Sequence, residues 1–123
     1  MKYRFLILLV LLPGSAWALD ADGRYLMHGA GAVSCGTFVQ AENGTVYDAV
    51  GTRGDMLAWA QGYLSFYNRH TEDVYDIYGY TDTKGIEVWL YNFCRSNPLQ
   101  HFADALEALI KQLYSRRIIS APR

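Results

Sequence analysis

The residues best suited to chemistry are Cys35 and Cys94, the only two cysteines in the chain. A cysteine becomes a nucleophile when a positively charged helix end or a positioned histidine lowers its thiol pKa. No recognisable nucleophile–base motif links Cys35 to His28 or His101. We therefore predict that the chain is not an enzyme, although free thiols in the purified protein would reopen that question.

Acidic and tyrosine side chains alternate in residues 69–83, RHTEDVYDIYGYTDT. Carboxylates are good ligands for Ca²⁺, but this segment lacks the regular ligand order of a calcium loop, and Gly79 is not framed by ligands. We predict no metal site and no cofactor here. The segment instead supplies the candidate partner-binding residues, which are Tyr75, Asp76, Tyr78, Tyr80 and Asp82.

Two interpretations of residues 69–83 remain open. In the first, the segment is an ordered loop whose tyrosines lie partly on the domain. In the second, it is a recognition loop, because tyrosine offers a large amphipathic contact area and long loops in compact domains are often functional. A β-hairpin is a weaker third alternative. We take the recognition loop as the working hypothesis.

The N-terminus has the pattern of a secretory signal peptide. Lys2 and Arg4 make a basic start, residues 5–12 form an apolar run, and residues 16–18 (Ala-Trp-Ala) fit a small-x-small cleavage site. A membrane-spanning helix needs roughly 20 apolar residues, which is far longer than this run. We expect cleavage after residue 18, a periplasmic mature chain and no membrane association afterwards. The alternative is an uncleaved N-terminal anchor.

Export also bears on the two cysteines and on the charge. Disulfides persist in oxidising compartments, and two cysteines allow only one pairing. Closing a loop of about 60 residues should stabilise the fold by roughly 4 kcal/mol in the chain-entropy model.

Without Lys2 and Arg4 the mature chain carries nine basic against twelve acidic residues. This balance, with a single basic cluster at Arg116-Arg117, gives no indication of a nucleic-acid partner.

Hydrophobic periodicity predicts helices and no confident strand. Apolar side chains recur at spacings of three and four residues in each predicted helix. The predicted helices cover about residues 35–41, 53–68, 84–95 and 98–116. The fold class expected from this pattern is all-α, a small disulfide-linked bundle of about four helices.

Local signals place the ends of these helices. Ser34, then Thr52 or Asp55, and then Thr83 are plausible N-caps. Asn97-Pro-Leu-Gln predicts the last helix, with Asn97 as N-cap and the proline at its first position. Gly62 interrupts the central helix, which would make sense if another helix crossed closely there.

These elements divide the chain into four parts. Residues 1–18 are the signal peptide, and residues 19–33 are a lead segment with a glycine-rich bend. The helical domain covers residues 34–117, and residues 118–123 are expected to form a flexible tail. The sequence therefore predicts a single domain.

Four short motifs follow one another along the chain. Ser-Cys-Gly occupies residues 34–36, and Trp-x-x-Gly-Tyr-Leu occupies residues 59–64. Trp-Leu-x-x-Phe-Cys-x-x-Asn-Pro-Leu covers residues 89–99, and Phe-x-x-Ala-x-x-x-Leu follows at residues 102–109. This layout resembles the Rap/Tai family of type VI secretion immunity proteins, which belongs with the HdeA-like periplasmic proteins.

The resemblance implies a small, HdeA-like α-helical domain of the periplasm with a disulfide between Cys35 and Cys94. Members are often dimeric, so a homodimer is left open. Characterised members bind and block peptidoglycan-cleaving amidase toxins delivered by rival cells. The function expected from the resemblance is therefore an immunity-type inhibitor with a cell-wall amidase effector as its protein partner. The alternative is an acid-stress periplasmic chaperone of the HdeA type.

Overall fold

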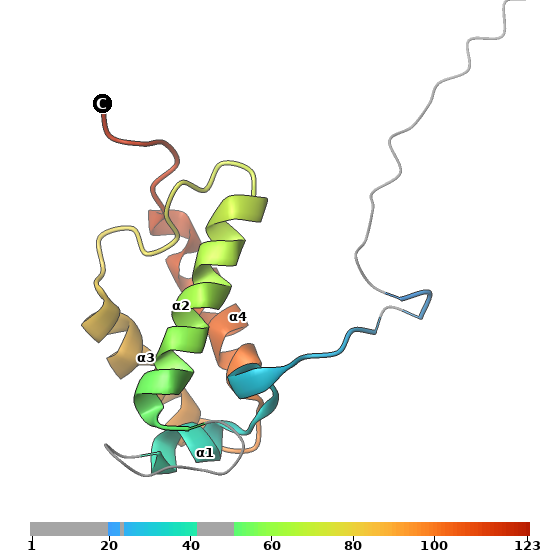
Figure 1. Cartoon of the computed structure of the whole chain (residues 1–123). Helices are drawn as coiled ribbons and strands as arrows, with labels where there is room; N and C mark the ends of the chain where they lie inside the picture. The colour runs from blue at the N-terminus through green and yellow to red at the C-terminus, as the bar shows by residue number, and fades with distance from the viewer. Residues whose placement is uncertain (1–19, 23, 42–50) are drawn as a thin grey trace, which may run out of the picture.

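The computed structural model describes residues 20–22, 24–41 and 51–123. The predicted signal peptide (1–18) and the predicted connection at residues 45–50 lie outside the described residues. Figure 1 shows the elements of the described part, which are η1 (Gly29–Ala32), α1 (Cys35–Gln40), α2 (Arg53–His70), α3 (Thr83–Ser96), α4 (Phe102–Leu113) and η2 (Tyr114–Arg116). The described residues thus form four α-helices and no strand, which confirms the all-α prediction.

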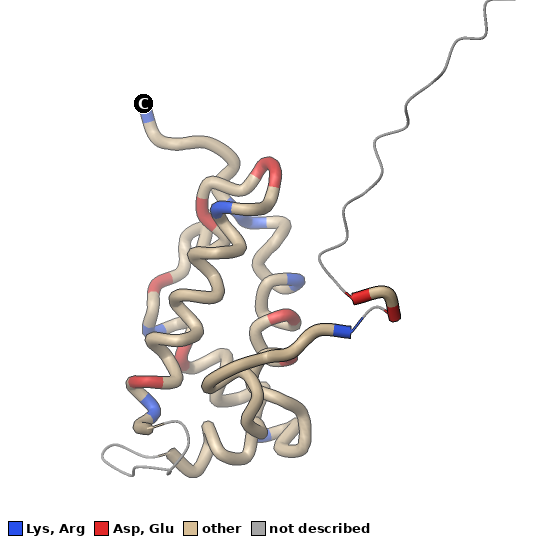
Figure 2. The backbone as a smooth tube through the Cα atoms, turned by 45° about the vertical axis from the view of Figure 1, so that its right-hand side comes forward, with Lys and Arg blue, Asp and Glu red and all other residues tan. Residues whose placement is uncertain are grey.

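The core lies between the four helices. α2, α3 and α4 run along the length of the molecule, and α1 lies at one end, where it contacts α3 and α4 (Figure 1). Among the described residues, every fully buried side chain is apolar or a cysteine, and none is charged. Acidic and basic residues are interspersed over the described part of the chain (Figure 2). Apolar burial is therefore the main force that holds the bundle together.

The disulfide between Cys35 and Cys94 is present, as predicted. It joins the first turn of α1 to the last turn of α3, and both cysteines are fully buried. Next to it, the ring of Phe38 on α1 packs on the ring of Phe102 on α4, with 4.7 Å between their centroids. The short helix α1 is thus attached to the bundle both covalently and by aromatic packing.

Two helices begin where the sequence places them. The hydroxyl of Ser34 accepts a hydrogen bond from the amide of Thr37 at the start of α1. At the start of α2, the Thr52 hydroxyl accepts from the Asp55 amide, and the Asp55 carboxylate accepts from the Thr52 amide at 2.8 Å. These contacts satisfy amides that have no partner inside the helix. The N-cap of α3, in contrast, is Asp82 rather than Thr83, because the Asp82 carboxylate accepts a hydrogen bond from the amide of Gly85, the third residue of the helix.

The last helix begins later than the sequence predicts. α4 starts at Phe102, and the amide of His101 donates to the carboxylate of Asp104 at 3.0 Å. The predicted start at Pro98 is wrong, and so is the predicted cap at Asn97. A local capping pattern is only a weak preference, which tertiary contacts can override.

Those tertiary contacts involve the first amides of α1. The carbonyl oxygen of Gln100 accepts from the amide of Cys35 at 2.7 Å, and that of Pro98 accepts from the amide of Gly36 at 2.9 Å. Amides at a helix start need such external acceptors. Because this pairing holds the chain outside the helix, Leu99 is 95 % exposed instead of joining the apolar stripe of α4.

Trp59 and Tyr63 connect α2 to its neighbours. The indole of Trp59 lies against Gly31 of η1, at a position where a methyl group would collide with the ring. Trp59 also stacks on Tyr63, with 5.4 Å between ring centroids. The Tyr63 hydroxyl donates to the carboxylate of Glu107 on α4. Partial burial raises the pKa of Tyr63, and the hydrogen bond to Glu107 raises it further.

Gly62→Ala is expected to stabilise the protein by about 1 kcal/mol, because alanine loses less backbone entropy in a helix. Gly62 is exposed, and an added methyl group would meet no atom within 4 Å, so a close crossing by another described helix does not explain this glycine. Urea denaturation of the variant measures the effect. Gly31→Ala is the matched control and should destabilise, since its methyl group would meet the ring of Trp59. A Gly62→Ala variant no more stable than the wild type would contradict this account of α2.

Candidate protein-binding surface

The loop that joins α2 to α3, residues 71–82, carries the five candidate residues; we call it the tyrosine loop. Two of its apolar side chains, Val74 and Ile77, are buried in the core with 7 % and 0 % exposure. Burying a side chain fixes the backbone on either side of it. The tyrosine loop is therefore attached to the domain at two points, while Tyr75 between these points and Tyr80 after them are exposed.

Asn68, in the last turn of α2, holds the middle of the tyrosine loop. Its side-chain oxygen accepts a hydrogen bond from the amide of Ile77 at 2.9 Å. Its side-chain nitrogen donates to the carboxylate of Asp76 at 3.3 Å, and the same carboxylate accepts from the amide of Tyr78 at 3.0 Å. This network pairs loop amides that would otherwise rely on water.

Residues 117–119, which we call the C-terminal strap, hold the start of the tyrosine loop. The carbonyl oxygen of Ile118 accepts from the amides of Tyr75 and Asp76 at 2.7 and 3.0 Å, and its own amide donates to the carbonyl of Asp76 at 2.9 Å. The guanidinium of Arg117 donates to the carbonyl of Asp73 at 2.9 Å. The expected flexible tail is thus wrong for Ile118, which forms an antiparallel bridge with Asp76.

Removal of the C-terminal strap should loosen the tyrosine loop locally. In a chain that ends at Arg116, the amides of Tyr75 and Asp76 lose their acceptor, and we expect them to exchange hydrogen about tenfold faster or more. Native-state hydrogen exchange measures this at single residues. A chain that ends at Ser120 keeps the strap and is the control. Equal exchange rates in both truncated chains would show that the strap does not order the loop.

The five candidate residues differ in exposure and in their contacts. Tyr75 and Tyr80 are 52 % and 94 % exposed and are free to meet a partner. Tyr78 is half-buried, and its pKa is raised by burial and by the negative charge of Asp76. Asp76 is held by the Asn68 network, and Asp82 caps α3. The structure therefore leaves the side chains of Tyr75 and Tyr80 exposed to solvent and gives the two carboxylates structural contacts.

Sequence reasoning missed further exposed apolar side chains at the same end of the molecule. Phe66 in the last turns of α2 is 63 % exposed, Tyr114 after α4 is 41 % exposed, and Ile119 in the strap is 64 % exposed. Arg117 stacks on the ring of Tyr114 at 4.0 Å. No local pattern signals these three residues, because their exposure depends on how the helix ends and the strap meet.

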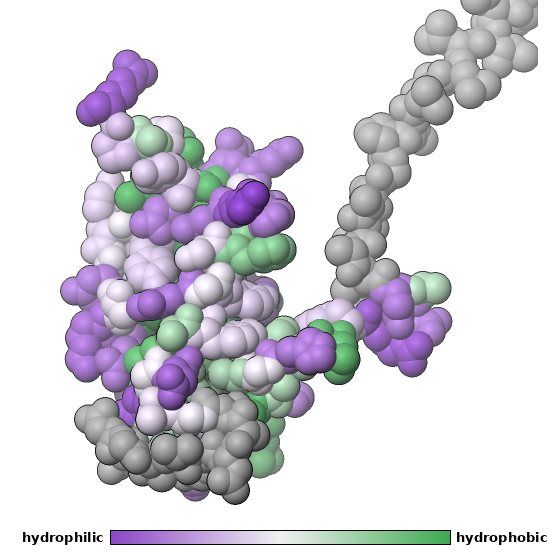
Figure 3. Space-filling view, viewed as in Figure 1, coloured by the Kyte–Doolittle hydropathy of each residue, from purple (hydrophilic) through white to green (hydrophobic). Residues whose placement is uncertain are grey.

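We define the distal surface as the exposed apolar side chains at this end of the bundle. It includes residues from the ends of α2 and α4, from the tyrosine loop and from the strap, which lie at one end of the bundle (Figure 1). In the space-filling view, pale and green residues are mixed with purple ones at this end (Figure 3). The members of the distal surface are Phe66, Tyr75, Tyr80, Tyr114 and Ile119.

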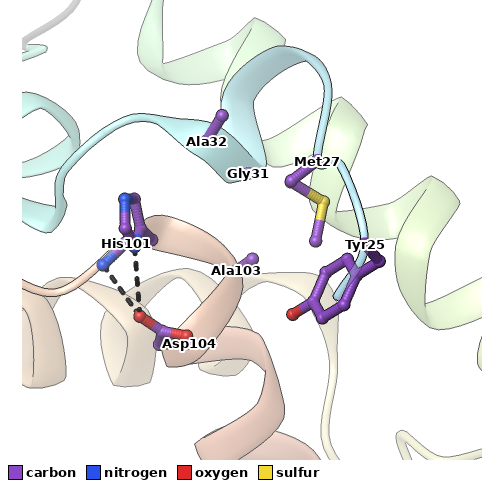
Figure 4. A pocket seen from close by; sticks show the side chains of 7 residues that line it. All are labelled: Tyr25, Met27, Gly31, Ala32, His101, Ala103 and Asp104. Carbon is purple, nitrogen blue, oxygen red and sulfur yellow. Dashed lines mark hydrogen bonds and ion pairs between the residues drawn. The ribbon is translucent and has the colours of Figure 1, made fainter. Parts of the chain in front are cut away.

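A separate hollow of about 210 Å³ lies between the lead segment and the start of α4. Tyr25 and Met27 form one side of it, and His101 and Asp104 form the other (Figure 4). The Asp104 carboxylate accepts from the His101 amide and lies 3.6 Å from its ring nitrogen, so it serves to cap α4. None of the five predicted residues lines this hollow.

Two further observations concern ligands and membranes. Within residues 20–22, 24–41 and 51–123, no group of three or more His, Cys, Asp or Glu side chains is arranged to hold a metal ion. No helix in the described part of the chain is long and apolar enough to cross a bilayer.

Comparisons of this chain with protein-family models, with curated proteins and with solved structures gave no match.

Proposed function

We propose that this chain is a non-catalytic, exported binding protein that contacts a protein partner through the distal surface. The observation that carries the proposal is the combination of two highly exposed tyrosines, Tyr75 and Tyr80, with a loop backbone held by buried anchors, Asn68 and the strap. Exposed apolar residues gathered at one place on a protein mark interaction sites more often than scattered ones do.

The physical argument is one of pre-organisation. Tyrosine buries a large area on binding, loses little side-chain entropy and is enriched among the residues that dominate binding energy. A loop that is already ordered loses less backbone entropy when the complex forms. The tyrosine loop combines both properties, which suits a stoichiometric protein-binding role.

The class of partner rests on the sequence resemblance to immunity proteins of the Rap/Tai family. On that basis we propose a peptidoglycan-degrading amidase effector as the partner and the periplasm as the compartment. The all-α fold and the disulfide are compatible with this proposal.

The test uses the mature chain and a secreted peptidoglycan-degrading amidase, which should be sought first in the open reading frame next to the gene for this chain; this enzyme is called the hydrolase below. We expect an equimolar amount of the chain to abolish the release of peptidoglycan fragments by that hydrolase, with a one-to-one complex in calorimetry. The chain alone should release no fragments. Binding without inhibition would refute the immunity role, and fragment release by the chain alone would refute the non-catalytic assignment.

The acid-stress chaperone alternative makes a different prediction about pH. Such a protein must expose apolar surface at about pH 2–3, where carboxylates become protonated. Since the described core contains no buried charged residue, acid should act on surface caps rather than on the core. We therefore expect no binding of an apolar dye at pH 3; strong dye binding with protection of client proteins would favour the chaperone.

Asp55 provides a specific pH dependence. Hydrogen bonds from the amide and then the hydroxyl of Thr52 lower the pKa of Asp55 from its ordinary value of 3.8. Because the folded pKa is the lower one, this carboxylate stabilises the fold above pH 3.8, and its contribution disappears as the pH falls through the folded pKa. Thermal melts between about pH 5 and pH 2 should show a smaller decline in Asp55→Asn than in the wild type. Parallel declines would contradict this role of Asp55.

A further inference from the structure

A groove of about 200 Å³ lies between α3 and α4, beside the end of the tyrosine loop. Its apolar wall includes Trp89 and Ile86 on α3 and Leu113 on α4. Trp89 is half-buried and stacks on Phe93, with 5.3 Å between ring centroids, so one part of its indole is fixed and another part faces the groove. The size suits a single aromatic or branched aliphatic side chain.

The rim of the groove carries one charged side chain, Arg116. Ion pairs within the described part of the chain do not include Arg116, which is exposed. A guanidinium beside an apolar wall is complementary to a ligand that joins an apolar group to a carboxylate. The groove therefore has a defined chemical preference and is not simply an apolar patch.

The groove is continuous with the distal surface. Gly79 of the tyrosine loop has φ +61° and lies so close to the carbonyl of Arg116 that a side chain there would collide with it. Thr81 lines the groove directly after Tyr80, the most exposed tyrosine in the described part of the chain. A partner that covers Tyr80 would therefore also reach the mouth of the groove.

We infer that this groove receives an apolar side chain of the protein partner, and that Arg116 pairs with a carboxylate next to that side chain. The inference rests on the proposed function and adds the chemistry of the partner: an acidic–apolar segment. The neighbouring Gln112 and Thr81 offer polar contacts at the rim. A few well-placed pockets beside an aromatic anchor are typical of the centre of a protein interface.

The first test uses small probes on the mature chain, so that it does not depend on finding the partner. Phenylacetate carries the ring and the carboxylate, and phenethylammonium is its charge-reversed analogue. In two-dimensional NMR spectra we expect phenylacetate to shift the indole N–H of Trp89 in a saturable way, while Trp59 serves as the internal control. Arg116→Gln should weaken phenylacetate binding about two- to fivefold, as expected for an exposed charge pair. Arg95→Gln, at the end of α3, should have no effect.

Equal shifts by the two probes, or unchanged phenylacetate affinity in Arg116→Gln, would overturn the inference. The second test uses the hydrolase complex. There, Arg116→Gln should weaken binding and Arg95→Gln should not. If Tyr80→Ala weakens the complex and Arg116→Gln does not, the groove inference fails while the proposed function stands. If the mature chain does not bind the hydrolase, the proposed function fails, and the probe experiment decides the chemistry of the groove independently.

Discussion

Replacing Cys35 and Cys94 together by alanine is expected to lower the free energy of unfolding by about 4 kcal/mol. The bond closes a loop with a sequence separation of 59, and opening it gives the unfolded chain many more conformations. The loss falls mainly on α1, whose six residues are too few to form a stable helix alone. For a domain of this size the melting temperature should fall by roughly 15–25 °C.

Chemical denaturation of the double variant and of the wild type measures this difference. Reductant provides the control: it should destabilise the wild type and leave the double variant unchanged, because only the wild type contains the disulfide. A difference of less than about 1 kcal/mol, typical of an ordinary surface change, would mean that packing of Phe38 and Phe102 alone is enough to hold α1.

Tyr75→Ala combined with Tyr80→Ala is expected to weaken binding to the partner about 100-fold, since each aromatic anchor in an interface contributes on the order of 1–2 kcal/mol or more. The melting temperature should change little, because both side chains are mainly exposed. Tyr78 and Asp76 are poor choices for this test. Tyr78 is half-buried and Asp76 is hydrogen-bonded to Asn68, so substitutions there would alter stability as well as binding.

Val88→Ala is the matched control for the tyrosine variant. Val88 is 50 % exposed on α3, outside the distal surface, and its truncation should leave the affinity for the partner unchanged. Wild-type affinity in the double tyrosine variant, measured by calorimetry with the purified hydrolase, would eliminate the tyrosine loop as the contact. Loss of affinity in Val88→Ala instead would move the contact to the outer face of α3.

The parts of the fold that sequence could predict depend on short-range contacts. Ser34 and Thr52 cap the helices that follow them through residues three positions away, so both helix starts can be read locally. The start of α4 cannot, because Pro98 and Gln100 bond to amides of α1 that are distant in sequence. A capping motif indicates that a helix end is favourable there, and the tertiary pairing decides whether it forms.

The exposure of the candidate residues could be predicted only in part, because it also depends on contacts between segments that are distant in sequence. The sequence marks the tyrosine loop by composition, and Tyr75 and Tyr80 are indeed exposed. It does not show that Val74 and Ile77 bury themselves or that Ile118 returns to pair with Asp76. Because these contacts join separate segments, exposure of single residues within the loop follows from the tertiary fold and not from the pattern of residue types.

The most direct test of the central claim is site-specific photo-crosslinking in the native host, with p-benzoylphenylalanine in place of Tyr80. The proposal that the distal surface contacts a protein partner predicts one discrete crosslinked protein from this position, and none when the same group replaces Val88. A crosslink from Val88 and none from Tyr80, or no crosslinked protein from either position while the wild-type chain still inhibits the hydrolase, would contradict it.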